Sequence, residues 1–309
     1  MGVGGWFFFR HNPSVPSFII PTPLPLARYS FTQLQKQTIT GGEITWGDEI
    51  ENTSFFTARL FSYPYEDKRI SGLAHIPHKS GKLPTIIMLR GYVDKEEYQS
   101  GIGTRHAAEI FARNGFITMA PDFLGYASSS AESFDVLEDR FSRPSQVLAL
   151  ISSFPTFSSI DLNRIGMWGH SNGGQIALSV LEISKKPIPT TLWAPVSKSF
   201  PYAMLYYTDE LSDQGKYLRH ELARFESDYD VLDYSIDGFF SNIAAPLLIH
   251  QGTSDEAVPK RWSDELVDKL KILKKEVTYY TYPGLDHNMT GSWNMVVDRD
   301  VAFFQKHLR

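Results

Sequence analysis

The amino-acid sequence predicts an α/β protein with a mostly parallel sheet and helices on both faces. Two observations support this fold class. From residue 84 to the C-terminus, short apolar segments alternate with longer segments whose apolar residues recur at helical spacing. Residues 84–90 are apolar without alternation, which is typical of a parallel strand buried on both faces. A chain of 309 residues is long enough to bury the core of such a sheet.

The first 45 residues predict an apolar arm and a proline-rich linker outside the sheet. Residues 2–9 are strongly apolar, and prolines recur every two or three residues over 12–26, which favours extended chain. The apolar stretch is too short to span a bilayer, which takes about 20 residues. Two interpretations stay open. In the first, the stretch is the trimmed end of a membrane anchor or signal segment, and the protein is membrane-proximal or exported. In the second, the stretch docks on the surface of the domain, and the protein is cytoplasmic.

The remaining elements are predicted in chain order. The polar, threonine-rich residues 31–46 are left open. Residues 54–63 and 68–76 predict an antiparallel hairpin, since Pro64, Glu66 and Asp67 between them favour a turn. Later strands are expected at residues 84–90, 116–120, 164–168, 190–194, 246–250 and 276–282. Helices are expected at residues 103–114, 136–153, 173–184, 262–274 and 292–307.

Residues 196–241 interrupt this alternation. They hold no strong strand, are rich in aromatic and charged residues, and are too many for a bare loop in a compact domain. We expect a small helical lid inserted after the sixth strand, dividing the core into residues 46–195 and 242–309. The aromatic side chains either form the core of the lid or line a pocket. Trp193, Tyr206 and Tyr207 are the candidates for the pocket wall.

Composition excludes several classes of function. The formal net charge is −5 with mixed signs, so the chain has no basic stripe for nucleic acid. It contains no cysteine, which excludes disulfides, a thiolate nucleophile and a Cys-ligated zinc.

A candidate nucleophile lies in residues 165–174, which read Ile-Gly-Met-Trp-Gly-His-Ser-Asn-Gly-Gly. The apolar run before this segment predicts a strand, and the residues after it predict a helix. In a Gly-x-Ser-x-Gly turn between strand and helix, the serine is held in a strained conformation with its hydroxyl exposed, and the glycines allow close approach of the backbones. Ser171 is therefore the predicted nucleophile.

A serine hydroxyl needs a base, and the base needs a third group that fixes its tautomer. With this turn, the partners follow the serine in the order Asp or Glu, then His, each on a loop after a strand. His287 lies on a Pro-Gly turn directly after the last strand and is the expected base. Asp255 follows the preceding strand and is the favoured acid; Glu256 and Asp286 are its rivals.

Two backbone N–H groups are expected to form an oxyanion hole. One belongs to Asn172, directly after the nucleophile. The other belongs to Tyr92, in the loop after the third strand, where Gly91 permits a tight turn.

These residues resemble the α/β-hydrolase superfamily, and within it the catalytic domain of the prolyl oligopeptidase family and its dienelactone-hydrolase-like relatives. The resemblance runs from about Phe61 to the C-terminus. It depends on residues 68–77, 120–126 and 161–174 and on the loops that hold the acid and the base. Relatives usually carry His-Gly where this chain has Arg90 and Gly91. Peptidases of the family also carry an N-terminal β-propeller, which the residues before Phe61 cannot hold.

Stand-alone relatives with a lid are often carboxylesterases, including enzymes that release aromatic acids from plant polymers. The resemblance therefore implies esterase activity for this chain. We therefore expect a serine esterase that acts on a small-molecule ester, with an aromatic acyl ester or a short peptide as substrate classes, and no metal or organic cofactor. Alternatives are a serine aminopeptidase or acyl-peptide hydrolase of the prolyl oligopeptidase family, and a non-catalytic binding protein on the same fold.

Overall fold

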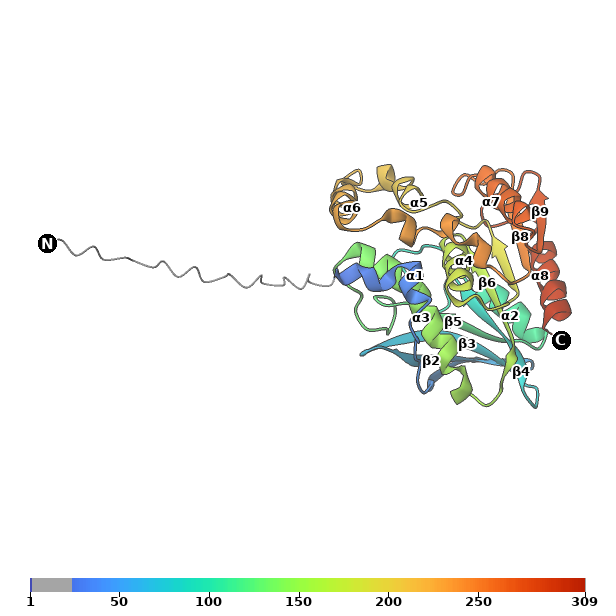
Figure 1. Ribbon diagram of the computed structural model, residues 1–309. Coiled ribbons are helices and arrows are strands. Elements are labelled where there is room, and N and C mark those ends of the chain that lie inside the picture. Colours follow the sequence, from blue (N-terminus) through green and yellow to red (C-terminus); the bar gives the residue numbers. More distant parts are fainter. Residues whose placement is uncertain (2–23, 309) are drawn as a thin grey trace.

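The structure is a computed structural model that describes Met1 and residues 24–308 (Figure 1). The expected apolar arm at residues 2–9 and most of the proline-rich linker lie outside the described residues. No helix in the described ranges is long and apolar enough to cross a membrane.

One sheet of nine strands runs through the molecule, in the order β1-β2-β3-β5-β4-β6-β7-β8-β9. The six strands from β5 to β9 in this order are parallel, whereas β1, β2 and β3 extend the sheet by antiparallel pairing. The predicted α/β fold class is confirmed. The strands are β1 (Thr45–Asn52), β2 (Phe56–Tyr65), β3 (Lys68–Pro77), β4 (Leu83–Leu89), β5 (Ile117–Pro121), β6 (Ile160–His170), β7 (Thr190–Trp193), β8 (Leu247–Gly252) and β9 (Val277–Tyr282).

Helices cover both faces of the sheet (Figure 1). Alternate residues of the central strand β4 belong to two different cores, one on each face. Ile87 and Leu89 join the core beneath α1, α3, α4 and α7, whereas Ile86 and Met88 join a second core beneath α2 and α8. A strand buried on both faces has no polar side, which explains its unbroken apolar sequence. The helices are α1 (Phe31–Leu34), α2 (Arg105–Arg113), α3 (Val136–Ser153), α4 (Asn172–Ser184), α7 (Lys260–Ile272) and α8 (Trp293–His307).

The sequence prediction missed β1 and the helical turns before it. In the described part of the chain, β1 is an edge strand that pairs with β2 alone. Most of its residues are exposed, so it lacks the apolar pattern that marks the other strands. Residues 25 and 26 were expected in extended chain but begin the 3-10 helix η1 (Pro25–Tyr29), because proline suits the first position of a helix. This helix and α1 pack on the domain through Tyr29 and Phe31.

The segment between β7 and β8 is helical, with α5 (Tyr202–Leu205), α6 (Lys216–Asp228) and four short 3-10 helices. We call it the insertion (residues 196–242). It follows the seventh strand of the sheet instead of the sixth, because β1 adds one strand before it. Its main apolar cluster includes Phe200, Phe225 and Tyr234, which surround Phe141 of α3 at ring-centroid distances of 5.0, 5.5 and 4.7 Å.

Candidate active site

Ser171 stands at the turn between β6 and α4. Its φ of 57° and ψ of −119° lie in a region that residues other than glycine rarely adopt. Three backbone hydrogen bonds hold it there: its N–H donates to the Trp193 carbonyl at 2.9 Å, and its carbonyl accepts from Gly174 and Val196, both at 3.0 Å. The strained turn is therefore fixed by the neighbouring strand and by the first turn of the helix.

Glycines allow three backbone segments to meet at this turn. A Cβ on Gly173 would lie 2.0 Å from the Leu89 carbonyl oxygen, so β4 and α4 come this close only without a side chain. A Cβ on Gly91 would lie 3.1 Å from the Cβ of Ser171, which places the loop after β4 directly beside the serine.

Asp255 and His287 are joined across two loops that follow β8 and β9. The Asp255 carboxylate accepts a hydrogen bond from His287 Nδ1 at 2.8 Å, and its side chain is fully buried. The other carboxylate oxygen accepts from the N–H groups of Ala257 and Val258, and Gln251 Nε2 donates to the oxygen that faces the histidine. The acid thus holds its own loop in shape and fixes the orientation of the imidazole.

The rival groups lie elsewhere. Glu256 is exposed. Asp286 accepts hydrogen bonds from backbone N–H groups, with that of Thr290 the main contribution, and these lower the pKa of its carboxyl. His250 is buried between Tyr282 and Asp300, at 2.7 and 2.9 Å, so this histidine links β8 to β9 and α8.

His170, directly before the serine, connects the two halves of the site. Its ring centroid lies 4.6 Å from that of His287, and its Nε2 donates to the His287 carbonyl at 3.1 Å. Burial, with a contribution from His287, lowers the pKa of His170 to about 4, so the ring is neutral at neutral pH. It positions the loop of His287 beside Ser171. No hydrogen bond joins the Ser171 hydroxyl to His287 in the described chain.

Two backbone N–H groups beside Ser171 have no partner among the described residues: that of Tyr92 and that of Asn172 at the start of α4. A helix N-terminus adds partial positive charge at this point. The Tyr92 side chain is 72% exposed and donates to Asp94, which raises the pKa of its hydroxyl to about 12.

Arg90 supports the loop that carries Tyr92, a role that sequence reasoning missed. The side chain is buried, and its guanidinium donates to the Gly91 carbonyl at 2.9 Å and to the Asp122 carbonyl at 3.3 Å. It lies over the rings of Tyr98 and Tyr126, at 4.3 and 4.0 Å from their centroids. The signal in the sequence that could have indicated this role is the arginine before Gly91, where relatives usually carry histidine.

Two cavities adjoin the turn. One of about 410 Å³ lies beside His170, and Trp193 of the predicted pocket wall lines it with Trp168 and Trp293. A smaller one of about 50 Å³ lies beside Asn172, between α3, α4 and the insertion.

The other predicted wall residues pack against α7. The rings of Tyr206 and Tyr207 lie 4.8 and 6.3 Å from Trp262, and the Tyr207 hydroxyl donates to the Ala257 carbonyl at 3.1 Å. The insertion thereby contacts the loop that holds Asp255. No group of three or more His, Asp or Glu side chains is placed to hold a metal ion within the described part of the chain.

The chain is similar in sequence to a known protein family and to a bacterial peptidase. The sequence profile of the prolyl oligopeptidase family matches residues 103–309. An uncharacterized peptidase of Bacillus subtilis, YtmA, is 23% identical over 264 residues, which cover 81% of this chain and 94% of the relative.

Solved structures show the same fold. Acetyl xylan esterase 1 from Thermoanaerobacterium has a TM-score of 0.65 at 14% identity, over 89% of this chain and 92% of the esterase. The acylaminoacyl peptidase of Pyrococcus horikoshii has a TM-score of 0.61 at 19% identity, over 83% of this chain but 42% of the peptidase.

Proposed function

The chain belongs to the prolyl oligopeptidase family and is a serine hydrolase. From this premise, we propose that it cleaves carboxylic esters. In this proposal Ser171 is the nucleophile, His287 is the base, and Asp255 is the acid that orients the base. The hydrogen bond between Asp255 and His287 Nδ1 carries the proposal. Because Nδ1 holds the proton, the lone pair of Nε2 is free to accept one from a serine.

The proposed reaction runs through an acyl-enzyme. His287 takes the proton of Ser171, whose oxygen attacks the ester carbonyl, and the oxyanion accepts hydrogen bonds from the N–H groups of Tyr92 and Asn172. The alcohol leaves with a proton from His287, and water then releases the acid by the same steps. The hydrogen bond between Ser171 and His287 forms when substrate is bound, as catalytic hydrogen bonds often tighten only in the complex.

The charges around the site favour an ester over an aminopeptidase substrate. An aminopeptidase binds the α-ammonium of its substrate, whereas the residues that line the cavity beside Asn172 include two cationic ones, Arg140 and Arg143. The esterase whose fold is similar is also matched over nearly its whole length. An acyl-peptide hydrolase, whose substrate has no free ammonium, is the second candidate, supported by the family and by the similar acylaminoacyl peptidase.

A matched pair of substrates tests the proposal. N-acetylalanine methyl ester should be hydrolysed, and N-acetylalanyl p-nitroanilide should be cleaved at a negligible rate. Substantial turnover of the anilide would favour the acyl-peptide hydrolase. Failure of a fluorophosphonate probe to label the folded protein would contradict both.

Replacing Arg90 with methionine should lower kcat about 10- to 100-fold with little change in KM. The loop after β4 then loses the guanidinium that binds the Gly91 carbonyl, and complete loss of one oxyanion donor typically costs about 10²- to 10³-fold. Steady-state kinetics on folded protein, checked by circular dichroism, measures the effect. Arg59→Met is the control, since the exposed side chain of Arg59 in β2 also donates to a carbonyl, that of Gly47 in the neighbouring strand β1. An unchanged kcat in Arg90→Met would show that the loop keeps its shape without this side chain.

A further inference from the structure

The small cavity beside Asn172 has two arginines, Arg140 and Arg143, in a mostly apolar and aromatic wall, and the proposed reaction uses neither. It lies between α3 and α4 and is closed by residues of the insertion, including Phe200 and Tyr234. Its volume is about 50 Å³. Since a cavity of about 150 Å³ accepts benzene, this one has room for a smaller group.

Of the two arginines in this cavity, Arg140 is the one that forms no ion pair with a carboxylate of the described chain. Its Nη2 donates to the Gln175 side-chain oxygen at 2.5 Å, and no carboxylate of the described chain lies within ion-pair distance. The Gln175 amide is held in this orientation, because its nitrogen donates to the Lys198 carbonyl at 3.3 Å. Arg140 is therefore fixed by a neutral group, and the charge of Asp139 acts on its guanidinium without direct contact.

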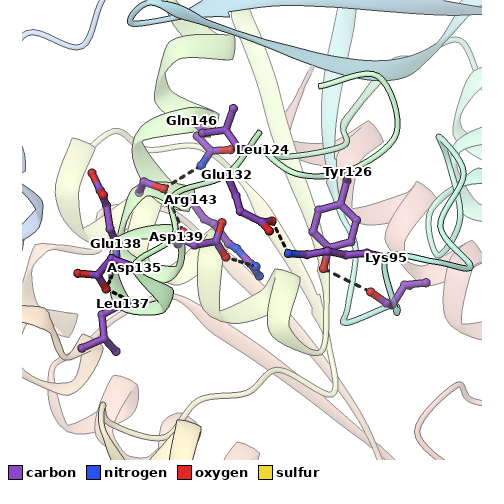
Figure 2. A network of polar contacts seen from close by, with 12 residues as sticks. Lys95, Leu124, Tyr126, Glu132, Asp135, Leu137, Glu138, Asp139, Arg143 and Gln146 are labelled. Atoms are coloured by element: carbon purple, nitrogen blue, oxygen red, sulfur yellow. Dashed lines mark hydrogen bonds and ion pairs between the residues drawn. The ribbon is translucent and has the colours of Figure 1, made fainter. Parts of the chain in front are cut away.

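The neighbouring carboxylates make their direct contacts with groups other than Arg140. Arg143, one turn further along α3, pairs with Asp139 at 2.7 Å (Figure 2), and its Nε has no hydrogen-bond partner among the described residues. Glu138 accepts hydrogen bonds from Tyr29 and Ser133. Burial and the charge of Arg143 lower the pKa of Arg140 to about 10, so the guanidinium stays charged at neutral pH.

The position of the cavity assigns it to the acyl part of the substrate. Its wall includes Asn172, whose N–H is the proposed oxyanion donor, but no residue of the loops that hold Asp255 and His287. The leaving alcohol must lie near His287, which protonates it. A group that fills this cavity therefore belongs to the acyl side of the scissile bond.

We propose that Arg140 determines substrate specificity by pairing with a carboxylate on the acyl group, so that the preferred substrates are monoesters of short dicarboxylic acids. The proposal rests on the proposed function. A guanidinium and a carboxylate in a partly buried cavity form charge-assisted hydrogen bonds, stronger than neutral ones. The cavity volume limits the chain to a few carbons, as in a succinate monoester.

Two esters of equal shape test this specificity. The wild-type enzyme should hydrolyse monoethyl succinate with a kcat/KM about 10- to 100-fold above that of ethyl succinamate, whose amide replaces the carboxylate. Arg140→Gln should abolish this preference by raising KM for the succinate ester, and leave the succinamate within about threefold of wild type. Arg140→Lys should restore part of the preference, and Arg224→Gln, on the exposed face of α6, should change neither ester.

Equal losses for both esters in Arg140→Gln would show a structural role and overturn the proposal, as would a wild-type enzyme that does not distinguish them. Calorimetric titration of Ser171→Ala with the same two esters separates this outcome from failure of the proposed function. Tighter binding of the succinate ester that is lost in Ser171→Ala/Arg140→Gln supports the carboxylate site even if the wild-type chain hydrolyses neither. Equal binding of the two esters contradicts it.

Discussion

Ser171→Ala is expected to lower kcat for ester hydrolysis by roughly 10⁴- to 10⁶-fold, because no other group replaces the nucleophile. The change removes one oxygen and keeps the strained backbone, which is fixed by hydrogen bonds from neighbouring segments and not by the hydroxyl. The melting temperature should therefore stay close to that of the wild type. Initial rates with N-acetylalanine methyl ester and labelling by a fluorophosphonate probe measure the effect.

Ser184→Ala is the matched control, since Ser184 ends the same helix and its hydroxyl accepts a hydrogen bond from the N–H of Lys186. It should retain full activity and labelling. If Ser171→Ala keeps more than a few per cent of the activity, or is still labelled, the nucleophile is another residue.

Asp255→Asn should lower kcat by about 10³- to 10⁴-fold. The asparagine oxygen can still accept from Ala257 and Val258, so the loop keeps its shape. Its NH₂ group then faces His287 Nδ1 and forces that nitrogen to become an acceptor. The proton moves to Nε2, which can no longer accept one from the serine.

Glu256→Gln provides the control, because it removes the neighbouring, exposed carboxylate and should leave kcat within about twofold. Comparable losses in the two variants would indicate a general electrostatic effect of the loop. Activity near that of the wild type in Asp255→Asn would remove this residue from the proposed mechanism.

The sequence predicts the fold and the candidate triad because both depend on local patterns. The turn around Ser171 needs glycines at fixed positions, and the contacts of Gly173 with β4 show the reason. The order of strands then directs attention to the loops of Asp255 and His287. Their hydrogen bond agrees with that expectation, although their roles in catalysis stay a prediction.

Other features depend on contacts between distant segments and have no local signature. Strand β1 forms by pairing with β2, although its exposed side chains show no apolar pattern. Arg90 becomes buried only because Tyr98 and Tyr126 surround its guanidinium. Arg140 lies in α3, and nothing along the sequence of this helix indicates that Gln175 would be its partner.

The aromatic contacts of the insertion have a consequence for engineering this scaffold. Its rings pack on two side chains outside the insertion, Phe141 of α3 and Trp262 of α7, which belong to helices that cover the sheet. A chimera that takes this segment from a homologue therefore receives the rings of the insertion without the homologue's partner side chains at positions 141 and 262. Swapping the segment to alter selectivity requires positions 141 and 262 to be exchanged with it, so the transferable module is discontinuous along the gene.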